Sequence, residues 1–276
     1  MELSLVLVSQ GIESVIVPPA EEHGWQLAVD ARNFERAVAS IKAYRAENRR
    51  PWTQELPVTG MVFDYRSVVW FLLVIAFFVL EQTRLPILRE AGLMHNQAVQ
   101  SGEWWRLFTA ILLHGDIPHL IANVTTGILL LGLAMGGLGP GWALLGSYLA
   151  GAGGNLAGYL VYGVDHRGLG ASGMVMGALG LMAGQSVALL RSGVGPAQLI
   201  LRGLLGGFLL LVLVGLDPNT DVIAHVGGFA SGVVVGAILT LLNGKLASHN
   251  GWNRVAELLS GLMVAVTWWL ALSRTQ

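Results

Sequence analysis

The hydrophobic positions of the chain change their pattern at about residue 66. Before it, apolar residues alternate with polar ones over short stretches, and after it they form long runs with few charges. A helix needs about 20 apolar residues to cross a bilayer, with a range of about 17–25. Seven runs reach that length, or approach it with flanking residues: 67–80, 117–135, 142–162, 171–190, 198–216, 224–242 and 255–272. The pattern predicts a polytopic helical membrane domain.

The first 50 residues predict a small α+β module instead. Leu3 and Leu7 followed by Gly11 are typical of a short helix that ends at a glycine cap. The same apolar stretch also fits a strand, because residues 5–8 show no clear period. We keep both interpretations of this stretch.

Two strands and a helix are predicted for the rest of the module. The strands cover residues 14–17 and 25–29, and Asp30 is placed to cap the helix. Its apolar positions recur at intervals of three, four and three residues, which is one helix face. They are Ala31, Phe34, Val38 and Ile41. We expect a regulatory or partner-binding module, since it holds no catalytic cluster.

Composition and charge narrow the class of protein. Of all residues 54% are hydrophobic and 12% are charged, whereas soluble proteins carry about 25% charged residues. Sixteen of the 33 charged residues lie in residues 1–66. These values exclude one soluble globular domain and a disordered chain. A net charge of −1 offers no basic surface for nucleic acid, and the absence of Cys excludes disulfides, thiolate zinc sites and a cysteine nucleophile.

The basic residues favour one orientation in the membrane. With a cytoplasmic N-terminus, 11 Lys and Arg residues lie inside and 5 lie outside. Seven spans then place the C-terminus outside. We expect an integral multi-pass protein of a bacterial inner membrane, with a soluble domain and linker at 1–60, a membrane domain at 61–245, and a linker with a seventh helix at 246–276.

Glycine is concentrated in the membrane domain, where 33 of the 37 glycines follow residue 100. Small residues let membrane helices approach closely. The fourth and sixth runs each carry glycines at helical spacing, which predicts that these two helices pack against each other, although general membrane packing explains glycines too. The glycines are Gly173, Gly177, Gly180 and Gly184 in the fourth run, and Gly228, Gly232 and Gly236 in the sixth.

Polar residues stand near the start of three of these runs. His119 and Asn123 share a face of the second run, Ser172 begins the fourth, and His225 begins the sixth. Even-numbered spans run in one direction, so these four residues lie at similar depth. Taken singly, the serine can bond its own helix, and the asparagine and histidines can serve packing. Together they predict a hydrolytic set with Ser172 as nucleophile, His225 as general base, and His119 and Asn123 as oxyanion donors.

Four motifs at these positions resemble the rhomboid family of intramembrane serine proteases, over about residues 60–245. Their order and their placement on the runs make the resemblance specific. The motifs are Trp105-Arg106 in the long connection 81–116; His114, His119 and Asn123; Gly170, Ser172 and Gly173; and Ala224, His225, Gly228 and Gly232.

The resemblance implies an all-α polytopic membrane protein: a six-helix rhomboid-like bundle with a seventh C-terminal transmembrane helix, joined to the small α+β N-terminal domain. It implies a serine endopeptidase with a Ser172–His225 dyad, which needs neither metal nor cofactor, and leaves Asp221 as a helix cap. The connection 81–116 would lie partly in the outer leaflet and brace the fold. Substrates would be single-span membrane proteins, cut within or beside the lipid bilayer.

Two positions depart from the family pattern. Met176 stands where Tyr or Phe often supports the histidine, although a thioether can also pack against imidazole. Residues 133–136 lack the glutamate that often ends the second span.

Other functions fit less well. The alternative is a non-proteolytic rhomboid-like protein that binds or routes client membrane proteins; loss of the nucleophile or histidine would indicate it, and both are present. A transporter predicts paired charges deep in the spans, and a metalloprotease predicts His-Glu-x-x-His; neither pattern occurs. The oligomeric state stays open.

Overall fold

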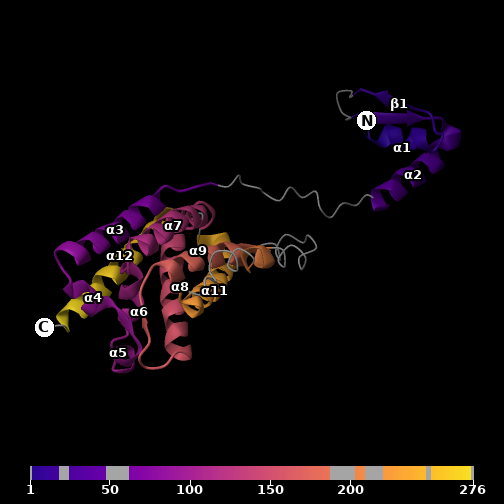
Figure 1. Cartoon of the computed structure of the whole chain (residues 1–276). Coiled ribbons are helices and arrows are strands. Elements are labelled where there is room, and N and C mark those ends of the chain that lie inside the picture. The colour runs from indigo at the N-terminus through magenta and orange to yellow at the C-terminus, as the bar shows by residue number, and fades with distance from the viewer. Residues whose placement is uncertain are drawn as a thin grey trace. The chain divides into compact units, whose positions relative to one another are not determined.

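The computed structural model divides the chain into two compact units, Met1–Leu56 and Pro57–Gln276 (Figure 1). The structure describes residues 2–18, 25–47, 62–186, 203–208, 220–246 and 250–274.

Unit 1 is the predicted α+β module. It consists of α1 (Glu2–Ser9), β1 (Ser14–Val17), β2 (Gln26–Val29), a 3₁₀ turn at Ala31–Asn33 and α2 (Phe34–Glu47). The first stretch is therefore a helix and not a strand. Gly11, at φ +68°, lets the chain turn back, and the Ile12 amide donates to the Leu7 carbonyl at 2.9 Å. The strands pair antiparallel.

The core of unit 1 differs from the prediction at α2. Leu7, Ile12 and Ala37 form it, with Ile41 packed against them, whereas Phe34 is 60% exposed. The predicted face of Ala31, Phe34, Val38 and Ile41 is therefore wrong, except at Ile41. The physical reason for this difference is the 3₁₀ turn, which Asp30 caps by accepting a hydrogen bond from the Arg32 amide. Because α2 begins only at Phe34, the residue that faces α1 is Ala37.

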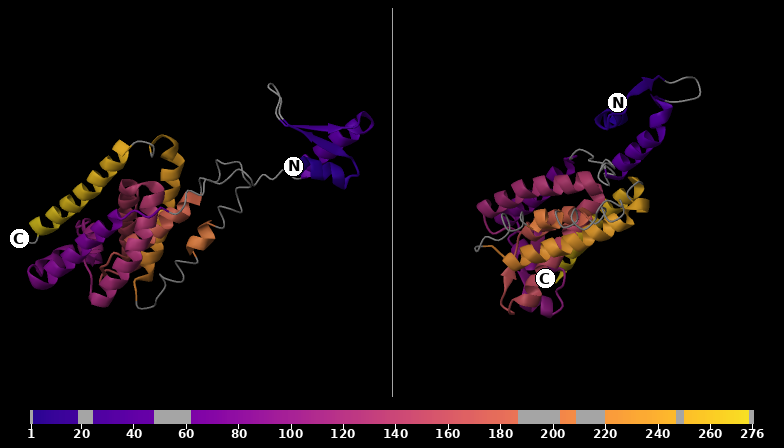
Figure 2. Two further views of the ribbon diagram at one scale, coloured as in Figure 1. Left: turned by 90° about the horizontal axis from the view of Figure 1, so that it is seen from above. Right: turned by 90° about the vertical axis from the view of Figure 1, so that its right-hand side faces the viewer.

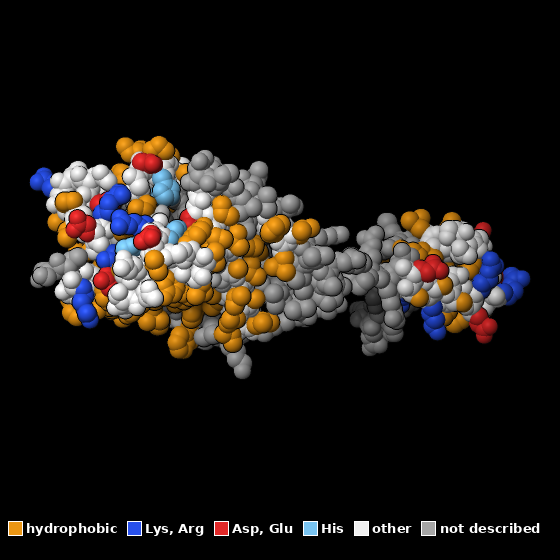
Figure 3. All heavy atoms as spheres, turned by 60° about the horizontal axis from the view of Figure 1, so that its bottom comes forward, with side chains coloured by type: hydrophobic (Ala, Val, Ile, Leu, Met, Phe, Trp, Pro, Cys, Tyr) orange, Lys and Arg blue, Asp and Glu red, His pale blue; other side chains and the backbone are white. Residues whose placement is uncertain are grey.

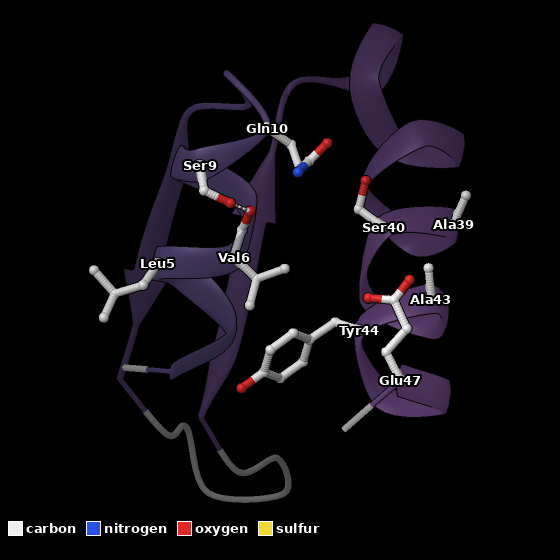
Figure 4. Close-up of a pocket in the computed structure, with 9 residues that line it drawn as sticks. All are labelled: Leu5, Val6, Ser9, Gln10, Ala39, Ser40, Ala43, Tyr44 and Glu47. Carbon is white, nitrogen blue, oxygen red and sulfur yellow. Dashed lines mark hydrogen bonds between the residues drawn. The ribbon is translucent and has the colours of Figure 1, made fainter. Parts of the chain in front are cut away.

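A groove of about 690 Å³ separates α1 from α2 in this unit (Figure 4). Leu5 and Val6 line one side, and Ser40, Tyr44 and Glu47 line the other. Glu47 is the one ionisable carboxylate of this lining, so the groove does not resemble a hydrolytic centre.

Unit 2 is helical. Its long helices are α3 (Arg66–Thr83), α7 (Ile117–Leu138), α8 (Pro140–Val161), α9 (Ser172–Gly184), α11 (Val222–Leu246) and α12 (Asn250–Ser273). Among the described residues, four helices are long and apolar enough to cross a membrane: 66–83, 117–138, 222–242 and 251–273. The chain thus carries multiple apolar spans, as predicted.

The remaining predicted runs have different outcomes. The third run forms α8, whose 22 residues are rich in glycine. The fourth forms the apolar helix α9, which has 13 residues among those described. The predicted run at 198–216 lies outside the described residues, except for a helical stretch at 203–208.

Helix α9 is the centre of the bundle. It packs against α8, α11 and α7, while α3 packs on α7 and α12 packs on α8 (Figures 1 and 2). Most of its side chains are buried, including Met174, Met176 and Leu181. Ser172, at its first position, stands where this buried helix reaches the end of the bundle.

The glycines of α11 meet the backbone of α9, as predicted. A Cβ on Gly228, Gly232 or Gly236 would lie closer than 3.0 Å to a carbonyl oxygen of α9. The glycine face assigned to α9 needs one correction. Gly180 and Gly184 face α11, but a Cβ on Gly177 would collide with Ala150 of α8, because α9 is enclosed by helices on several sides.

The connection 81–116 folds into short elements. They are α4 (Ile87–Gly92), β3 (Met94–His95), α5 (Asn96–Gln100), α6 (Arg106–Thr109) and a 3₁₀ turn at Ala110–Leu112. Strand β3 pairs antiparallel with β4 (Arg167–Gly168), which lies between α8 and α9. The connection is therefore joined by backbone hydrogen bonds to the segment that leads to Ser172.

Helix α12 is integrated into unit 2 at both ends. At its start, Asn253 accepts from the Gly141 amide at 3.0 Å and so caps α8. Near its end, Trp268 packs against Gly92 of α4, and the guanidinium of Arg274 lies 5.8 Å from the Trp105 ring centroid. Helix α12 thus supports the connection 81–116.

Candidate active site

Two helix starts bring Ser172 and His225 into one region. Gly173 follows Ser172, and a Cβ on it would lie 3.5 Å from the carbonyl oxygen of Ala224, the residue before His225. One turn further, Gly228 leaves no room for a Cβ against the Gly173 carbonyl. Close helix approach of this kind is what a serine and a histidine need in order to reach hydrogen-bond distance.

The first turns of α7 border the same region. Asp116 caps α7 by accepting from the His119 amide at 2.8 Å. Gly170 has φ +127°, and a Cβ there would lie 2.7 Å from Cε1 of His119. The structure therefore places the other predicted site residues beside the segment that ends at Ser172.

Asn123 presents a polar group that is costly to bury. Its side chain is 5% exposed, and within the described part of the chain its Nδ2 has no hydrogen-bond partner. This nitrogen lies 3.7 Å from the Cβ position of Gly170. An unpaired buried donor costs about 1–3 kcal/mol, so a ligand oxygen that accepted from Nδ2 would relieve a real penalty.

His114 supports the residue that precedes Ser172. It is fully buried, and its Nε2 accepts from the Ala171 amide at 3.4 Å. Burial, with the neighbouring His119 second, lowers the pKa of His114 to about 3. The imidazole is therefore neutral at physiological pH and serves as an acceptor for the residue before Ser172, not as an acid or base.

A cavity of about 640 Å³ opens beside Ser172. Its walls come from the start of α7, the segment around β4 and the turn before α11; the polar or charged residues among them are Asp116, His119, Arg167, Ser172, Thr220 and Asp221. Charged and histidine side chains gather toward one end of unit 2, and a broad hydrophobic surface adjoins them (Figure 3). A cavity that holds polar and charged side chains beside an apolar surface fits a reaction that needs water near a membrane.

The Trp-Arg motif stabilises the connection 81–116. Trp105 is buried, and Arg106 donates to Glu103 at 2.6 Å and to the carbonyls of Glu90 and Leu93 at 2.9 and 2.7 Å. These bonds are structural, since none of them reaches Ser172.

Two polar pairs near the site escaped the sequence interpretation. Arg89 pairs with the buried Glu81 and donates to the His114 carbonyl at 2.8 Å. His166 pairs with Asp221 at 3.1 Å. The second pair joins residues 55 positions apart, and no spacing rule connects such residues. Among the described residues, no cluster of three or more His, Asp or Glu side chains fits a metal ion.

Comparison with known proteins defines the family. The rhomboid domain model matches residues 101–242, and the chain belongs to this family. RHOMBOID-like protein 5 of Arabidopsis thaliana is 32% identical over 163 residues, which cover 57% of this chain and 51% of that protein. Rhomboid protease GluP of Bacillus subtilis is 31% identical over 178 residues, or 61% of this chain and 33% of GluP. The chain spans between about a third and two thirds of the length of three curated relatives that it matches.

Proposed function

We propose that this protein is an intramembrane serine endopeptidase that cleaves single-span membrane proteins within or beside the bilayer. Ser172 is the nucleophile, His225 the general base, and Asn123 and His119 stabilise the oxyanion. The observation that carries the proposal is the close contact of the Ser172 and His225 helix starts next to the unpaired Nδ2 of Asn123. The name of the relative GluP, a rhomboid protease, supports the same reaction.

The proposed chemistry needs only these side chains. Ser172 Oγ attacks the scissile carbonyl carbon while His225 takes its proton. Asn123 and His119 donate to the oxygen that becomes negative, and the His225 proton then passes to the leaving amine. A water molecule, deprotonated by His225, hydrolyses the acyl-enzyme and regenerates Ser172.

The proposed orientation places this chemistry near the outer face of a bacterial inner membrane, with the N-terminus in the cytoplasm. The excess of Lys and Arg on the cytoplasmic side supports it. The cavity at one end of the bundle would then admit water from outside.

A fluorophosphonate probe tests the proposal. We expect the purified protein to be labelled at Ser172, as identified by mass spectrometry of the labelled peptide. Ser172→Ala and His225→Ala should each abolish labelling and cleavage, and the double variant should be no worse than either single variant, because the two groups act as a unit. Ser101→Ala, which changes an exposed serine of the connection 81–116, is the control. A folded protein that is never labelled favours the client-binding alternative.

A further inference from the structure

A side-chain contact joins the two segments that deliver Ser172 and His225. His166 lies in the segment between α8 and α9, six residues before Ser172, and Asp221 lies four residues before His225. Nε2 of His166 and Oδ2 of Asp221 are 3.1 Å apart. Both residues are partly buried, and Asp221 also lines the cavity beside Ser172.

His166 is fixed from its own side of this contact. Its imidazole stacks on the Tyr162 ring, with centroids 4.2 Å apart and planes 29° apart. Its carbonyl accepts from the Asn96 amide at 3.1 Å, and the Asn96 side chain donates to the carbonyls of Tyr162 and Gly163. The segment is thus anchored to the connection 81–116, and the imidazole is held by the Tyr162 ring as well as by Asp221.

Asp221 uses its oxygens for two different elements. Oδ1 accepts from the Ala224 amide at 2.9 Å, which caps α11, and its main-chain oxygen accepts from the His225 amide at 3.1 Å. Oδ2 faces His166. The predicted helix cap at Asp221 is confirmed. Its second carboxylate oxygen, Oδ2, contacts the segment between α8 and α9 through His166.

We propose that His166 and Asp221 are a positioning pair, which sets the separation of the Ser172 and His225 segments at the mouth of the catalytic cavity. The inference rests on the proposed function. The glycine contacts between α9 and α11 fix the helices from Gly228 inward; the His166–Asp221 contact fixes the segments that precede both helices. Neither residue touches the reacting atoms in this proposal.

The cap and the contact can be separated by substitution. Asp221→Ser keeps an N-cap oxygen but is too short to reach His166. Asp221→Asn keeps the cap, and its amide nitrogen can donate to a neutral imidazole in place of Oδ2. His166→Ala removes the contact and leaves the cap. Asp165→Ala is the control, because it removes an exposed carboxylate from the same segment.

The measurement is fluorophosphonate labelling of full-length protein, with the rate constant and the final labelled fraction determined separately. The final fraction counts folded, competent molecules, and the rate constant reports how well Ser172 and His225 are aligned. His166→Ala and Asp221→Ser should each lower the rate constant about tenfold or more, since a misplacement of about 1 Å can cost about 10²-fold. Their final fractions should equal that of wild type.

The remaining variants make the result decisive. Asp221→Asn and Asp165→Ala should keep rate constants close to wild type, and combining His166→Ala with Asp221→Ser should add no further loss. Wild-type rate constants in His166→Ala, multiplied losses in the double variant, or a loss confined to the final fraction would each overturn the positioning role. If wild type itself is not labelled at Ser172, the proposed function fails instead, so the two failures are distinguishable.

Discussion

At the scale of single residues, the site combines groups that burial would normally penalise. Asn123 places its Nδ2 near Gly170 without a partner among the described residues, and His114 is buried and neutral. Such costs persist in proteins where the surrounding structure fixes them, and they concentrate at functional sites. Here both groups lie beside the residues that precede Ser172: Asn123 is near Gly170, and His114 bonds the Ala171 amide.

Asn123→Ala should lower turnover of a membrane substrate while the fold stays intact. Losing one oxyanion donor costs about 10²–10³ in rate in serine proteases, and we expect a smaller loss because His119 is a second proposed donor. Initial cleavage rates check this, with thermal unfolding measured alongside. Thr125→Ala, which removes an exposed hydroxyl of α7 that bonds its own helix, should change neither. An unchanged rate in Asn123→Ala would leave the asparagine as a packing residue.

His114 predicts a dependence of stability on acid pH. Its folded pKa, about 3, lies below the ordinary value of 6.5 because of burial, so the unfolded chain binds a proton that the folded chain excludes. Stability that is present above pH 6.5 is lost as the pH falls toward about 3. The melting temperature of His114→Gln should therefore fall less between pH 7 and pH 5 than that of wild type. Parallel curves for the two proteins would contradict this assignment.

At the scale of elements, the contact between α9 and α11 decides where the helix starts lie. The glycine spacing predicted that these two helices pack against each other. In the structure, even a Cβ on Gly228 would collide with the Gly173 carbonyl. A backbone oxygen cannot move aside as a flexible side chain can, so the helices must separate.

Gly228→Ala should therefore lose both thermal stability and fluorophosphonate labelling. Gly236→Ala meets the Leu181 backbone two turns deeper, so it should cost comparable stability with a smaller effect on labelling. Gly261→Ala is the control, because nothing lies within 4 Å of the added Cβ in α12. Full labelling and full stability in Gly228→Ala would mean that the two helices do not approach as closely as described.

At the scale of the whole molecule, the proposed site and the elements that hold it belong to one unit. The four predicted site residues, the connection 81–116 and α12 all belong to unit 2. Helix α12 contributes an ion pair at its start as well, between Glu257 and Arg66 at 3.0 Å. Unit 1 has its own small core around Leu7, Ile12 and Ala37.

Deleting residues 1–56 should therefore leave the labelling rate constant at Ser172 within about twofold of wild type, because the proposed site residues and the contacts that hold them belong to unit 2. The time course of labelling in detergent-solubilised protein measures this rate constant directly. A tenfold loss would show that unit 1 contributes to the chemistry of unit 2. Normal labelling with lost cleavage of a physiological substrate would instead assign unit 1 to substrate selection.

Local pattern was sufficient for much of this protein. The apolar runs predicted α3, α7, α11 and α12, because an uninterrupted apolar helix satisfies its own backbone hydrogen bonds in the bilayer. Helical spacing predicted the glycine contact with α11, and the even-numbered spans predicted that Ser172, His225, His119 and Asn123 share one depth. Short motifs also predicted the family, which the comparisons confirmed.

Tertiary structure decided what local pattern does not encode. Which face of α2 is buried depended on where its 3₁₀ turn ends, and which helix each α9 glycine meets depended on enclosure by α7, α8 and α11. The folding of the connection 81–116 and the contact of His166 with Asp221 depend on residues far apart in the chain. Spacing rules reach only a few residues along one element, whereas these contacts exist only after separate elements have packed.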